Sequence, residues 1–293
     1  MEPMRTWLFA PGNHPRKVEK VFTVGADAVV LDLEDAVAVE QKTVTRATVV
    51  EALKARPKRA SRGYIRVNAI DTEFCYGDLK EVIGPWLDGI LLPKVESAGQ
   101  LQTIDWLLAQ LESACGMAVG GLDILPIIET GRGVTAIDEI ARSGTRVRRL
   151  SFGAGDFTND MGMVWTADES ELIYARSAIA LASRAAGLEA PIDTVFIDLQ
   201  DDEHLEKSAR TALSLGYRGK LCIHPAQIEP VNAVFTPSAK EVARARKHVE
   251  AFATAEAEGS ASIQVDGYFV DYPIVEKARR TLALMAAIDA KGR

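Results

Sequence analysis

Short apolar runs, each the length of one β-strand, recur eight times in the first 235 residues and alternate with stretches of helical periodicity. The clearest run, 124–128, carries no polar residue and is typical of a strand buried on both faces of its sheet. The stretch 169–186 has the spacing of a helix with one apolar face. We expect strands at 6–10, 28–33, 63–67, 89–92, 122–128, 148–153, 194–197 and 220–223.

Eight strand–helix units within about 230 residues are what a TIM (β/α)8 barrel requires. We therefore predict an α/β protein whose residues 1–237 form this barrel. An open, doubly wound sheet is the main rival, but no GxGxxG motif follows the first expected strand.

The pattern changes after residue 237. Ser238 has the chemistry of a helix N-cap and precedes a helix rich in Ala, Glu, Lys and Arg that is expected to end near Glu258. Residues 263–270 predict a tight hairpin that turns at Asp266-Gly267, and a final helix is expected over 274–290. Because the barrel is already complete, we expect residues 238–293 to serve as a lid or an oligomerisation arm.

Composition limits the binding partners and the cellular compartment that we expect for this protein. The formal net charge is −7 and the pI about 5.3, so no nucleic-acid partner is expected. The basic cluster 54–59 predicts a solvated helix end, with a role in binding an anionic cofactor as the alternative. Three scattered cysteines, Cys75, Cys115 and Cys222, indicate reduced thiols and a cytoplasmic location. No apolar stretch reaches the ~18 residues of a membrane span, and the N-terminus lacks a signal core.

Polar or charged groups stand where nearly every expected strand ends. Because strand ends meet at one face of a barrel, and that face carries active sites, we expect these groups to converge. The alternative is that Asp, Asn and Gly merely form turns and helix caps there, but six charged exits together favour convergence. The exits are Pro11-Gly12, Asp32 to Asp35, Arg66 to Asn68, Pro93-Lys94, Glu129, Asp156, Asp198 and His224-Pro225.

Glu129 and Asp156 follow neighbouring expected strands and are the candidate metal ligands. Mg²⁺ prefers oxygen ligands and is typically held by one or two carboxylates, with water and substrate completing its shell. Glu34 and Asp35 would then hydrogen-bond the water around the metal. Zinc is disfavoured because no His/Cys set has suitable spacing.

For four further candidate residues, the sequence leaves two interpretations open. Arg66 can grip a substrate carboxylate or carbonyl oxygen, or pair with Glu34 or Asp35. Lys94 can form a Schiff base, but nearby carboxylates favour an electrostatic role. His224 is either a general base or structural, and His14 is equally ambiguous.

Read together, the motifs resemble those of the citrate lyase β-subunit family (HpcH/HpaI aldolase/citrate lyase family), which includes malyl-CoA and citramalyl-CoA lyases. The resemblance spans almost the whole chain, with the motifs in order. They are Phe9-Ala-Pro-Gly12, Val30-Leu-Asp-Leu-Glu-Asp-Ala-Val37, Ile65-Arg-Val-Asn68, Leu92-Pro-Lys94, Ile128-Glu-Thr130, Gly153-Ala-Gly-Asp-Phe157, Cys222-Ile-His-Pro225 and, in the tail, Phe269-Val-Asp-Tyr-Pro-Ile-Val-Glu-Lys-Ala278.

This resemblance implies a TIM barrel, Mg²⁺ on Glu129 and Asp156, and CoA directed toward the barrel mouth. It implies that Arg66 faces the substrate carbonyl, with Lys94, Gly155 and Asp156 also at the substrate. It further implies a homotrimer or a dimer of trimers. Asp271 would belong to a lid that reaches a neighbouring subunit's site, whereas its residues alone predict only a helix start, since Pro273 follows.

The implied activity is an Mg²⁺-dependent carbon–carbon lyase that cleaves a 3-hydroxyacyl-CoA thioester to acetyl-CoA and a 2-oxo acid. Arg66 would stabilise the enolate, Asp271 would protonate it, and Glu34 and Asp35 would take part in catalysis through the water around the metal. Three alternatives stay open: the β subunit of a citrate lyase acting on a carrier-protein thioester, a metal-dependent 2-oxo-acid aldolase, and a barrel without catalysis. Citramalyl, malyl and citryl thioesters are all compatible with these residues.

Overall fold

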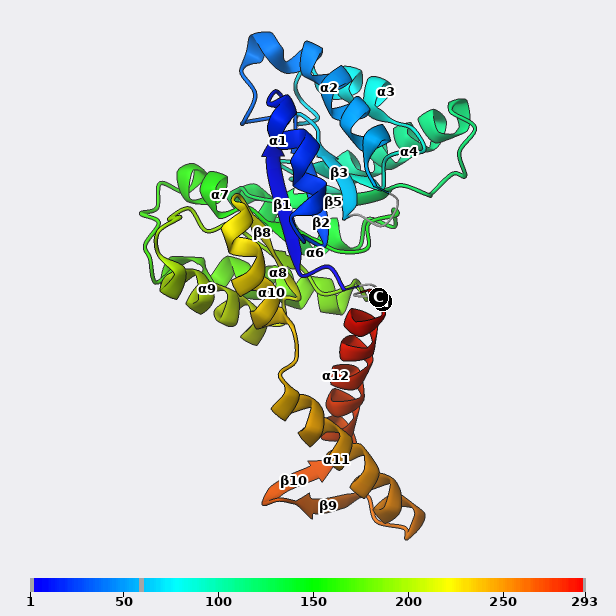
Figure 1. The fold of residues 1–293 in the computed structure, drawn as a ribbon, viewed down its shortest axis with the longest axis vertical. Coiled ribbons are helices and arrows are strands. Elements are labelled where there is room, and N and C mark those ends of the chain that lie inside the picture. The colour runs from blue at the N-terminus through cyan, green and yellow to red at the C-terminus, as the bar shows by residue number, and fades with distance from the viewer. Residues whose placement is uncertain (1–2, 58–60, 292–293) are drawn as a thin grey trace. The chain divides into compact units, whose positions relative to one another are not determined.

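The computed structural model describes residues 3–57 and 61–291, so Lys58 and Arg59 of the basic cluster lie outside the described residues. Eight parallel strands follow one another in chain order and close into a barrel, with β8 paired to β1 (Figure 1). The predicted TIM barrel is therefore confirmed. The strands are β1 (Thr6–Pro11), β2 (Ala28–Asp32), β3 (Arg62–Arg66), β4 (Gly89–Leu92), β5 (Asp123–Ile128), β6 (Ser151–Phe152), β7 (Ile192–Asp193) and β8 (Gly219–Cys222).

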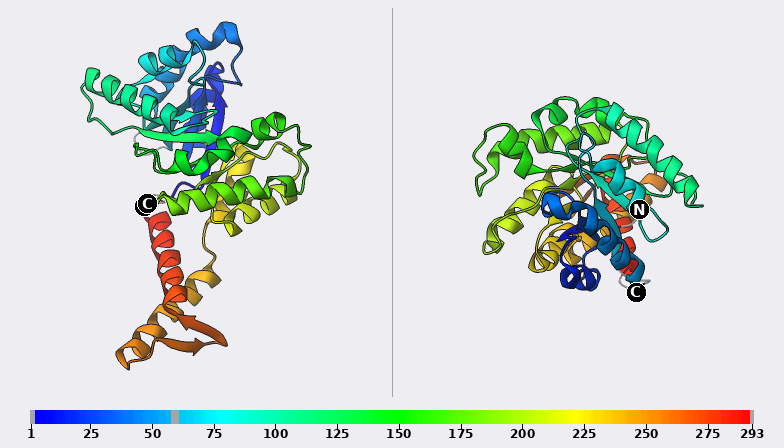
Figure 2. Two further views of the ribbon diagram at one scale, coloured as in Figure 1. Left: turned by 180° about the vertical axis from the view of Figure 1, so that it is seen from behind. Right: turned by 90° about the horizontal axis from the view of Figure 1, so that it is seen from above.

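Helices connect successive strands and surround them (Figure 2, right). They are α1 (Pro15–Lys20), α2 (Lys42–Ala55), α3 (Cys75–Val82), α4 (Ala98–Ala114), α5 (Gly131–Thr135), α6 (Ile137–Ala141), α7 (Ala154–Asp160), α8 (Ile173–Ala185), α9 (Asp202–Ser214) and α10 (Ile228–Phe235). The helix expected from residue 169 starts later. Glu169 has a left-handed φ of 53°, and a 3₁₀ turn (Ser170–Leu172) comes before α8.

Large apolar side chains fill the barrel interior. Trp7 of β1 and Tyr64 of β3 are buried, and their ring centroids lie 4.7 Å apart. They pack with inward-facing aliphatic residues of the other strands, among them Leu125 and Leu221. Side chains alternate between the two faces of a strand, so the inward positions recur every second residue. This period determines which residues reach the mouth of the barrel.

The predicted seventh strand was wrong. Residues 194–197 were expected to pair because they form an apolar run, but the ladder instead uses Ile192 and Asp193, which pair with β8. Asp193 is polar yet fully buried, because cations neutralise it from neighbouring elements. Asp198 therefore lies in an exposed turn, where its carboxylate accepts a hydrogen bond from the Gln200 N–H.

A buried ion network lies between the barrel wall and its helices on this side. Arg176 of α8 donates to both oxygens of Asp193, at 2.8 and 3.0 Å. Lys220 of β8 donates to the same carboxylate at 2.6 Å and to the Ser208 hydroxyl at 2.8 Å. Glu169 accepts from Arg176 at 2.7 Å and so balances the second cation. Burial alone would raise the pKa of Asp193, but these cations hold it below its usual range.

The chain from Ala233 onward belongs to a second compact unit, whereas residues 4–232 form the first. Ser238 caps α11 (Ala239–Ala257) through a reciprocal pair of bonds with Glu241, as the sequence predicts. Strands β9 (Ser262–Val265) and β10 (Tyr268–Asp271) form the expected antiparallel hairpin, and α12 (Tyr272–Lys291) follows. Asp266 and Gly267 turn the hairpin with φ values of 50° and 82°.

This second unit has its own apolar core, formed by Phe252, Val265, Val270 and Val275. The core ties the hairpin to α11 and α12, so the expected helix–hairpin–helix is confirmed as an arrangement of elements. The role of these elements as a lid remains a proposal.

We predict that Asp193→Ala lowers the free energy of unfolding by about 3–5 kcal/mol, because it leaves the buried Lys220 ammonium without its carboxylate. Urea denaturation measures the loss. Glu206→Ala is the control, since its ion pair with Arg210 is exposed and is worth less than about 1 kcal/mol. Equal losses in the two variants would contradict the stabilising role of the network.

Candidate active site

Charged side chains continue the inward-facing rows of the barrel at its carboxyl end. Val30, Tyr64 and Ile127 belong to the interior apolar cluster of strands β2, β3 and β5. Two residues further along each chain, the same inward position is occupied by Asp32, Arg66 and Glu129. The period of the strands thus brings these three residues to the mouth of the barrel, as the sequence predicts for Arg66 and Glu129.

Arg66 and Asp32 form the central ion pair. They are register partners in the β2–β3 ladder, and the guanidinium donates Nε–H and Nη2–H to the two carboxylate oxygens, each at 2.7 Å. Nη1 lies 2.9 Å from Glu34 and 3.3 Å from Asp35. Burial alone would lower the pKa of Arg66, but the three carboxylates raise it, so the guanidinium stays charged. The interpretation of Arg66 as the ion-pair partner of Glu34 and Asp35 is therefore confirmed, whereas its grip on a substrate oxygen stays a prediction.

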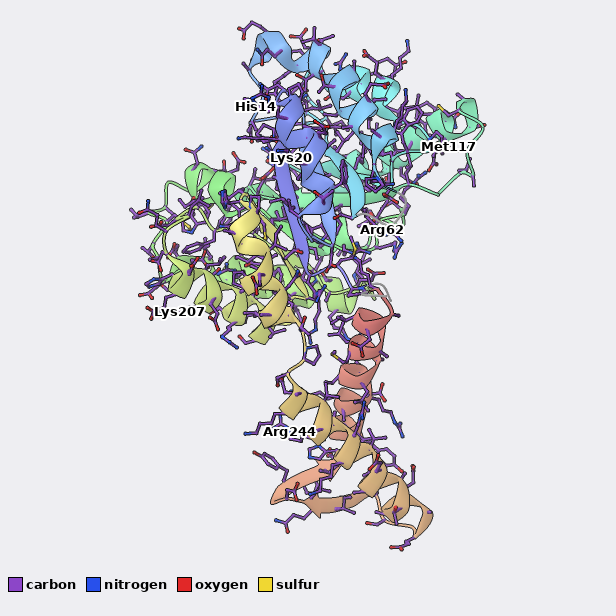
Figure 3. The ribbon with its side chains drawn as sticks, in the orientation of Figure 1. His14, Lys20, Arg62, Met117, Lys207 and Arg244 are labelled. Carbon is purple, nitrogen blue, oxygen red and sulfur yellow. The ribbon has the colours of Figure 1, made fainter. Side chains whose placement is uncertain are left out.

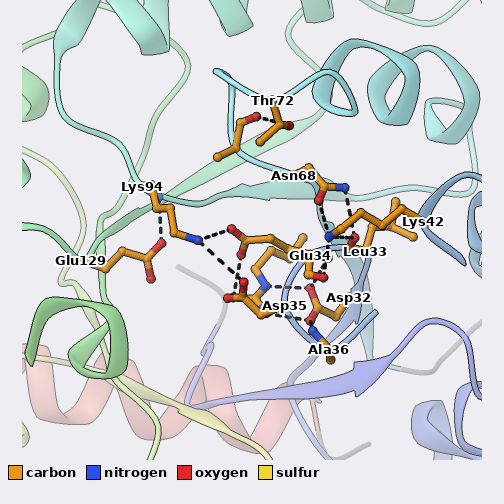
Figure 4. Close-up of polar contacts among 12 residues, drawn as sticks. Asp32, Leu33, Glu34, Asp35, Ala36, Lys42, Asn68, Thr72, Lys94 and Glu129 are labelled. Atoms are coloured by element: carbon orange, nitrogen blue, oxygen red, sulfur yellow. Dashed lines mark hydrogen bonds and ion pairs between the residues drawn. The ribbon is translucent and has the colours of Figure 1, made fainter. Parts of the chain in front are cut away.

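Glu34 connects the two cations of the site. Its Oε2 lies 2.9 Å from Arg66 Nη1, and its Oε1 accepts a hydrogen bond from Lys94 Nζ at 2.5 Å (Figure 4). Glu34 is buried, and burial raises the pKa of its carboxyl group even though both cations oppose the shift. Asp35 is more exposed and lies 3.8 Å from Lys94 Nζ.

Lys94 is held as an ammonium. Burial alone would lower its pKa, but the hydrogen bond to Glu34 and the charges of Glu34, Asp35 and Glu129 raise it above its usual range. A Schiff base requires the neutral amine, so the environment favours the electrostatic role expected for Lys94. Its backbone has a positive φ of 52°, which a non-glycine residue rarely adopts. In this conformation its N–H donates to Glu129 Oε1 at 2.8 Å.

Glu129 and Asp156 form the carboxylate pair of the site. Glu129 follows β5 and is 3% exposed, and Asp156 lies half-buried in the first turn of α7, just after β6. Burial, followed by the negative charge of Asp156, raises the pKa of Glu129 to about 8. Two carboxylates close enough to repel each other in a buried site are the electrostatic environment that a cation neutralises.

The donor set fits a hard divalent cation. Within residues 3–57 and 61–291, no group of three or more His, Cys, Asp or Glu side chains is arranged to hold a metal. The protein thus offers two carboxylates and leaves positions for water and substrate, which suits Mg²⁺ better than zinc. Gly153 supports the arrangement, because a Cβ there would lie 2.4 Å from Glu129 Oε2 and displace it.

Three other predicted residues fall outside this cluster of contacts. Gly155 is exposed at the start of α7, next to Asp156. Asp271 ends β10 in the second unit, where its Oδ1 accepts a hydrogen bond from the Ile274 N–H in the first turn of α12. His224 caps a 3₁₀ turn (Pro225–Gln227) through its Nδ1, which accepts from the Ala226 N–H at 3.2 Å. This contact supports the interpretation of His224 as a structural residue.

Asp32, Gly153 and Lys42 matter more than the sequence suggested. The period-two pattern of β2 could have identified Asp32 as an inward-facing residue beside Arg66. Gly153 lies within a recognised motif, but nothing in the sequence shows that its missing Cβ makes room for Glu129. Lys42 begins α2 and would be read as a solvated lysine, yet it is buried.

The fold and these contacts define a (β/α)8 barrel with a two-carboxylate centre flanked by an arginine and a lysine. The model of the family described as HpcH/HpaI aldolase/citrate lyase matches residues 5–225. Citrate lyase subunit beta of Leuconostoc mesenteroides subsp. cremoris is 38% identical over 291 residues, covering 98% of this chain and 96% of that protein. L-malyl-CoA/beta-methylmalyl-CoA lyase of Cereibacter sphaeroides is 35% identical, covering 94% of this chain and 92% of that protein.

Solved structures agree with this assignment. The CitE protein of Mycobacterium tuberculosis, in complex with magnesium, acetoacetate and coenzyme A, superposes with a TM-score of 0.77. It is 29% identical in sequence, and the match covers 97% of this chain and 98% of that one. The chain belongs to the HpcH/HpaI aldolase/citrate lyase family, and the expectation of a carbon–carbon lyase is confirmed at the level of the family.

None of the helices in the described part of the chain has the length and apolar character needed to cross a bilayer.

We predict that Gly153→Ala lowers the affinity for Mg²⁺ at least about tenfold, because the new Cβ pushes the Glu129 carboxylate out of position. Isothermal titration calorimetry measures the affinity. Gly155→Ala is the matched control, because its Cβ would meet only the Trp165 ring at 3.8 Å, an ordinary contact. Equal affinities in the two variants would show that Glu129 does not bind the cation.

The same method tests the raised pKa of Glu129. In the metal-free protein Glu129 is protonated below a pKa of about 8, and a cation must displace that proton. We expect the Mg²⁺ affinity to fall about tenfold for each pH unit below 8 and to level off above it. Titrations in two buffers with different ionisation enthalpies would count the proton released. An affinity independent of pH between about 6.5 and 9 would contradict the shift.

Proposed function

We propose that this protein is an Mg²⁺-dependent lyase that cleaves a 3-hydroxyacyl-CoA thioester of the citramalyl-CoA or malyl-CoA type to acetyl-CoA and a 2-oxo acid. The observation that carries the proposal is the Glu129–Asp156 pair beside Arg66 at the barrel mouth. The relatives named as malyl-CoA lyase, and the CitE structure with magnesium and coenzyme A, support the choice of metal and of substrate class.

Glu129 and Asp156 would hold Mg²⁺, which, when bound, acts as a Lewis acid toward the hydroxyl and carboxylate oxygens of the substrate. Arg66 would donate to the thioester oxygen. Nε–H and one Nη2–H of Arg66 go to Asp32, and Nη1 lies against Glu34 and Asp35, so one Nη2–H donor remains for a ligand. Glu34 and Asp35 would keep Arg66 and Lys94 in place and accept hydrogen bonds from water around the cation.

The reaction is a retro-Claisen cleavage. The substrate hydroxyl loses its proton to solvent, its oxygen becomes the carbonyl oxygen of the 2-oxo acid, and the adjacent carbon–carbon bond breaks. The electron pair of that bond forms the enolate of acetyl-CoA, whose oxygen Arg66 stabilises as charge develops. Asp271 would then donate a proton to the enolate carbon, which completes acetyl-CoA. In the condensing direction the same carboxylate would remove the methyl proton.

We propose that Asp271 acts as part of a lid on the site of another subunit in a homotrimer or a dimer of trimers. The tip of the hairpin and the start of α12 support this proposal, because Tyr268, Phe269 and Tyr272 leave more than half of their surface exposed there. Exposed aromatic residues next to one another are typical of a contact surface. Asp271 is half-buried and directly precedes Tyr272 in the chain.

The phosphates of CoA would meet the first helix of the barrel. Arg16, Lys17 and Lys20 are exposed on α1, which follows β1 at the mouth (Figure 3 labels His14 and Lys20 at the two ends of this helix). Three cations within one short helix suit a ligand that carries several phosphate charges.

A second candidate is the β subunit of a citrate lyase complex. It is favoured by the 38% identity to the Leuconostoc citrate lyase subunit beta over nearly the full length of both chains. That enzyme would act on a thioester carried by an acyl carrier protein. Free CoA thioesters would then be poor substrates, and turnover would require partner subunits.

We predict that the purified protein with Mg²⁺ cleaves citramalyl-CoA or malyl-CoA, and that Asp271→Asn lowers kcat at least about 100-fold. Mass spectrometry of the products distinguishes pyruvate from glyoxylate. Asp271→Asn should bind Mg²⁺ normally, whereas Glu129→Ala should lose both Mg²⁺ binding and cleavage.

Asp266→Ala is the matched control, because this other hairpin aspartate contacts Lys247 on the surface. It should retain the activity of the wild type. Cleavage that survives Glu129→Ala would overturn the metal-dependent mechanism. Failure to cleave either CoA thioester, together with cleavage of a carrier-protein citryl thioester in a reconstituted complex, would establish the second candidate.

A further inference from the structure

Lys42, the first residue of α2, is a buried lysine beneath the loop that carries Glu34. Its side chain is 8% exposed. Nζ donates to the carbonyl oxygens of Leu33 and Glu34, at 3.1 and 2.7 Å, and to Asn68 Oδ1 at 2.6 Å (Figure 4). An ammonium has three N–H donors, and these acceptors use all three. The ammonium is therefore directed at the backbone of the loop and not at a carboxylate.

The third acceptor is itself fixed by a chain of charged groups. Asn68 Nδ2 donates to Asp78 Oδ2 at 2.7 Å and to the Leu33 carbonyl at 3.0 Å, which orients the amide so that its oxygen faces Lys42. Asp78 accepts in turn from Arg46 Nε at 2.8 Å. Helices α2 and α3 thus anchor the Lys42 ammonium from behind the loop.

The loop after β2 is held from two sides. On the barrel side, the Asp32 carboxylate accepts from the N–H groups of Glu34 and Ala36, both at 3.0 Å. On the helix side, Lys42 binds the carbonyl groups of Leu33 and Glu34. Both the N–H and the C=O of Glu34 are consequently fixed, and from this backbone position its carboxylate reaches Arg66 and Lys94.

We propose that Lys42 is a positioning residue: its ammonium fixes the backbone at Leu33 and Glu34 and thereby places the Glu34 carboxylate between Arg66 and Lys94. Removing the ammonium takes one of the two donors from each of these carbonyl groups, because only Asn68 Nδ2 remains on Leu33 and only the Val37 N–H remains on Glu34, and the loop becomes freer to move. Lys94 then loses its hydrogen-bond partner, and Arg66 loses one of its carboxylate contacts. The catalytic consequence rests on the proposed lyase function, whereas the structural consequence does not.

The test uses Lys42→Met and Lys42→Ala in the full-length protein. Hydrogen–deuterium exchange should show faster exchange at residues 33–37 in both variants. With the thioester substrate, kcat should fall about 10–100-fold while KM changes less than about threefold. Propylammonium should restore part of the activity of Lys42→Ala, because it refills the site with three N–H donors, whereas tetramethylammonium, which has none, should not.

Lys220→Met is the matched control. Lys220 is also buried, but its bonds go to Asp193 and Ser208 in the ion network behind β7 and β8. It should lose stability while keeping kcat and the exchange of residues 33–37. Should Lys42→Met fail to fold, Lys42→Gln, which keeps two N–H donors, takes its place and should show a smaller fall in kcat.

The results distinguish the proposed lyase function from the proposed positioning role of Lys42. A wild-type protein that cleaves no thioester overturns the proposed function, and exchange at residues 33–37 in the variants still decides whether Lys42 positions the loop. Unchanged exchange in Lys42→Met overturns the inference. It is also overturned if kcat is retained, or if Lys220→Met loses as much kcat as Lys42→Met. Rescue of Lys42→Ala by propylammonium but not by tetramethylammonium supports the positioning role of Lys42.

Discussion

The ion pair between Asp32 and Arg66 is the contact on which the site depends. Because the two residues are register partners on adjacent strands, barrel closure fixes their separation, and both hydrogen bonds form at 2.7 Å. The contacts between the other charged residues of the site form a series that begins at this pair. Arg66 holds Glu34, Glu34 holds the Lys94 ammonium, and the Lys94 N–H holds Glu129. A series of bonds to carboxylates thus runs from β2 to the carboxylate pair. The side-chain charges alternate in sign from Asp32 to Lys94, and the last bond comes from the Lys94 backbone N–H.

The ion network behind β7 and β8 and the ion cluster at the barrel mouth differ in what their charges can do. Behind β7 and β8, Asp193 and Glu169 are matched by Arg176 and Lys220, and all four side chains are shielded by helices. At the mouth, acidic groups outnumber the cations, so burial leaves the pKa values of Glu34 and Glu129 raised. The pKa of Asp193, in contrast, is held below its usual range by its cations. Removing one member of a balanced buried cluster destabilises the fold, whereas unbalanced charge near solvent is available to a ligand.

Much of the fold and of the site could be predicted from the sequence, and the exceptions have physical reasons. Periodicity located seven strands, and strand exits located Arg66, Lys94, Glu129 and Asp156. The seventh strand was missed because Asp193 is buried only through its cations from α8 and β8. Lys42 was missed because its acceptors are backbone carbonyls of a loop, which no pattern of side chains reveals. Hydrophobic patterns with periods of 2 and 3.6 residues predict which apolar side chains are buried. They do not predict a buried polar side chain, because its burial depends on partners from distant parts of the chain.

The charge balance at the mouth explains why a proton and a cation compete there. Five carboxylates, those of Asp32, Glu34, Asp35, Glu129 and Asp156, surround the two cations of Arg66 and Lys94. Arg66 neutralises Asp32, so the excess of negative charge falls on the other carboxylates. Without a metal, burial and then the charge of Asp156 raise the pKa of Glu129 to about 8, and a proton on Glu129 relieves part of the excess. A divalent cation would relieve it further, and the carboxylate of the proposed substrate would then meet a site that is no longer repulsive. For the proposed function, the electrostatics therefore favour binding of the metal before the substrate.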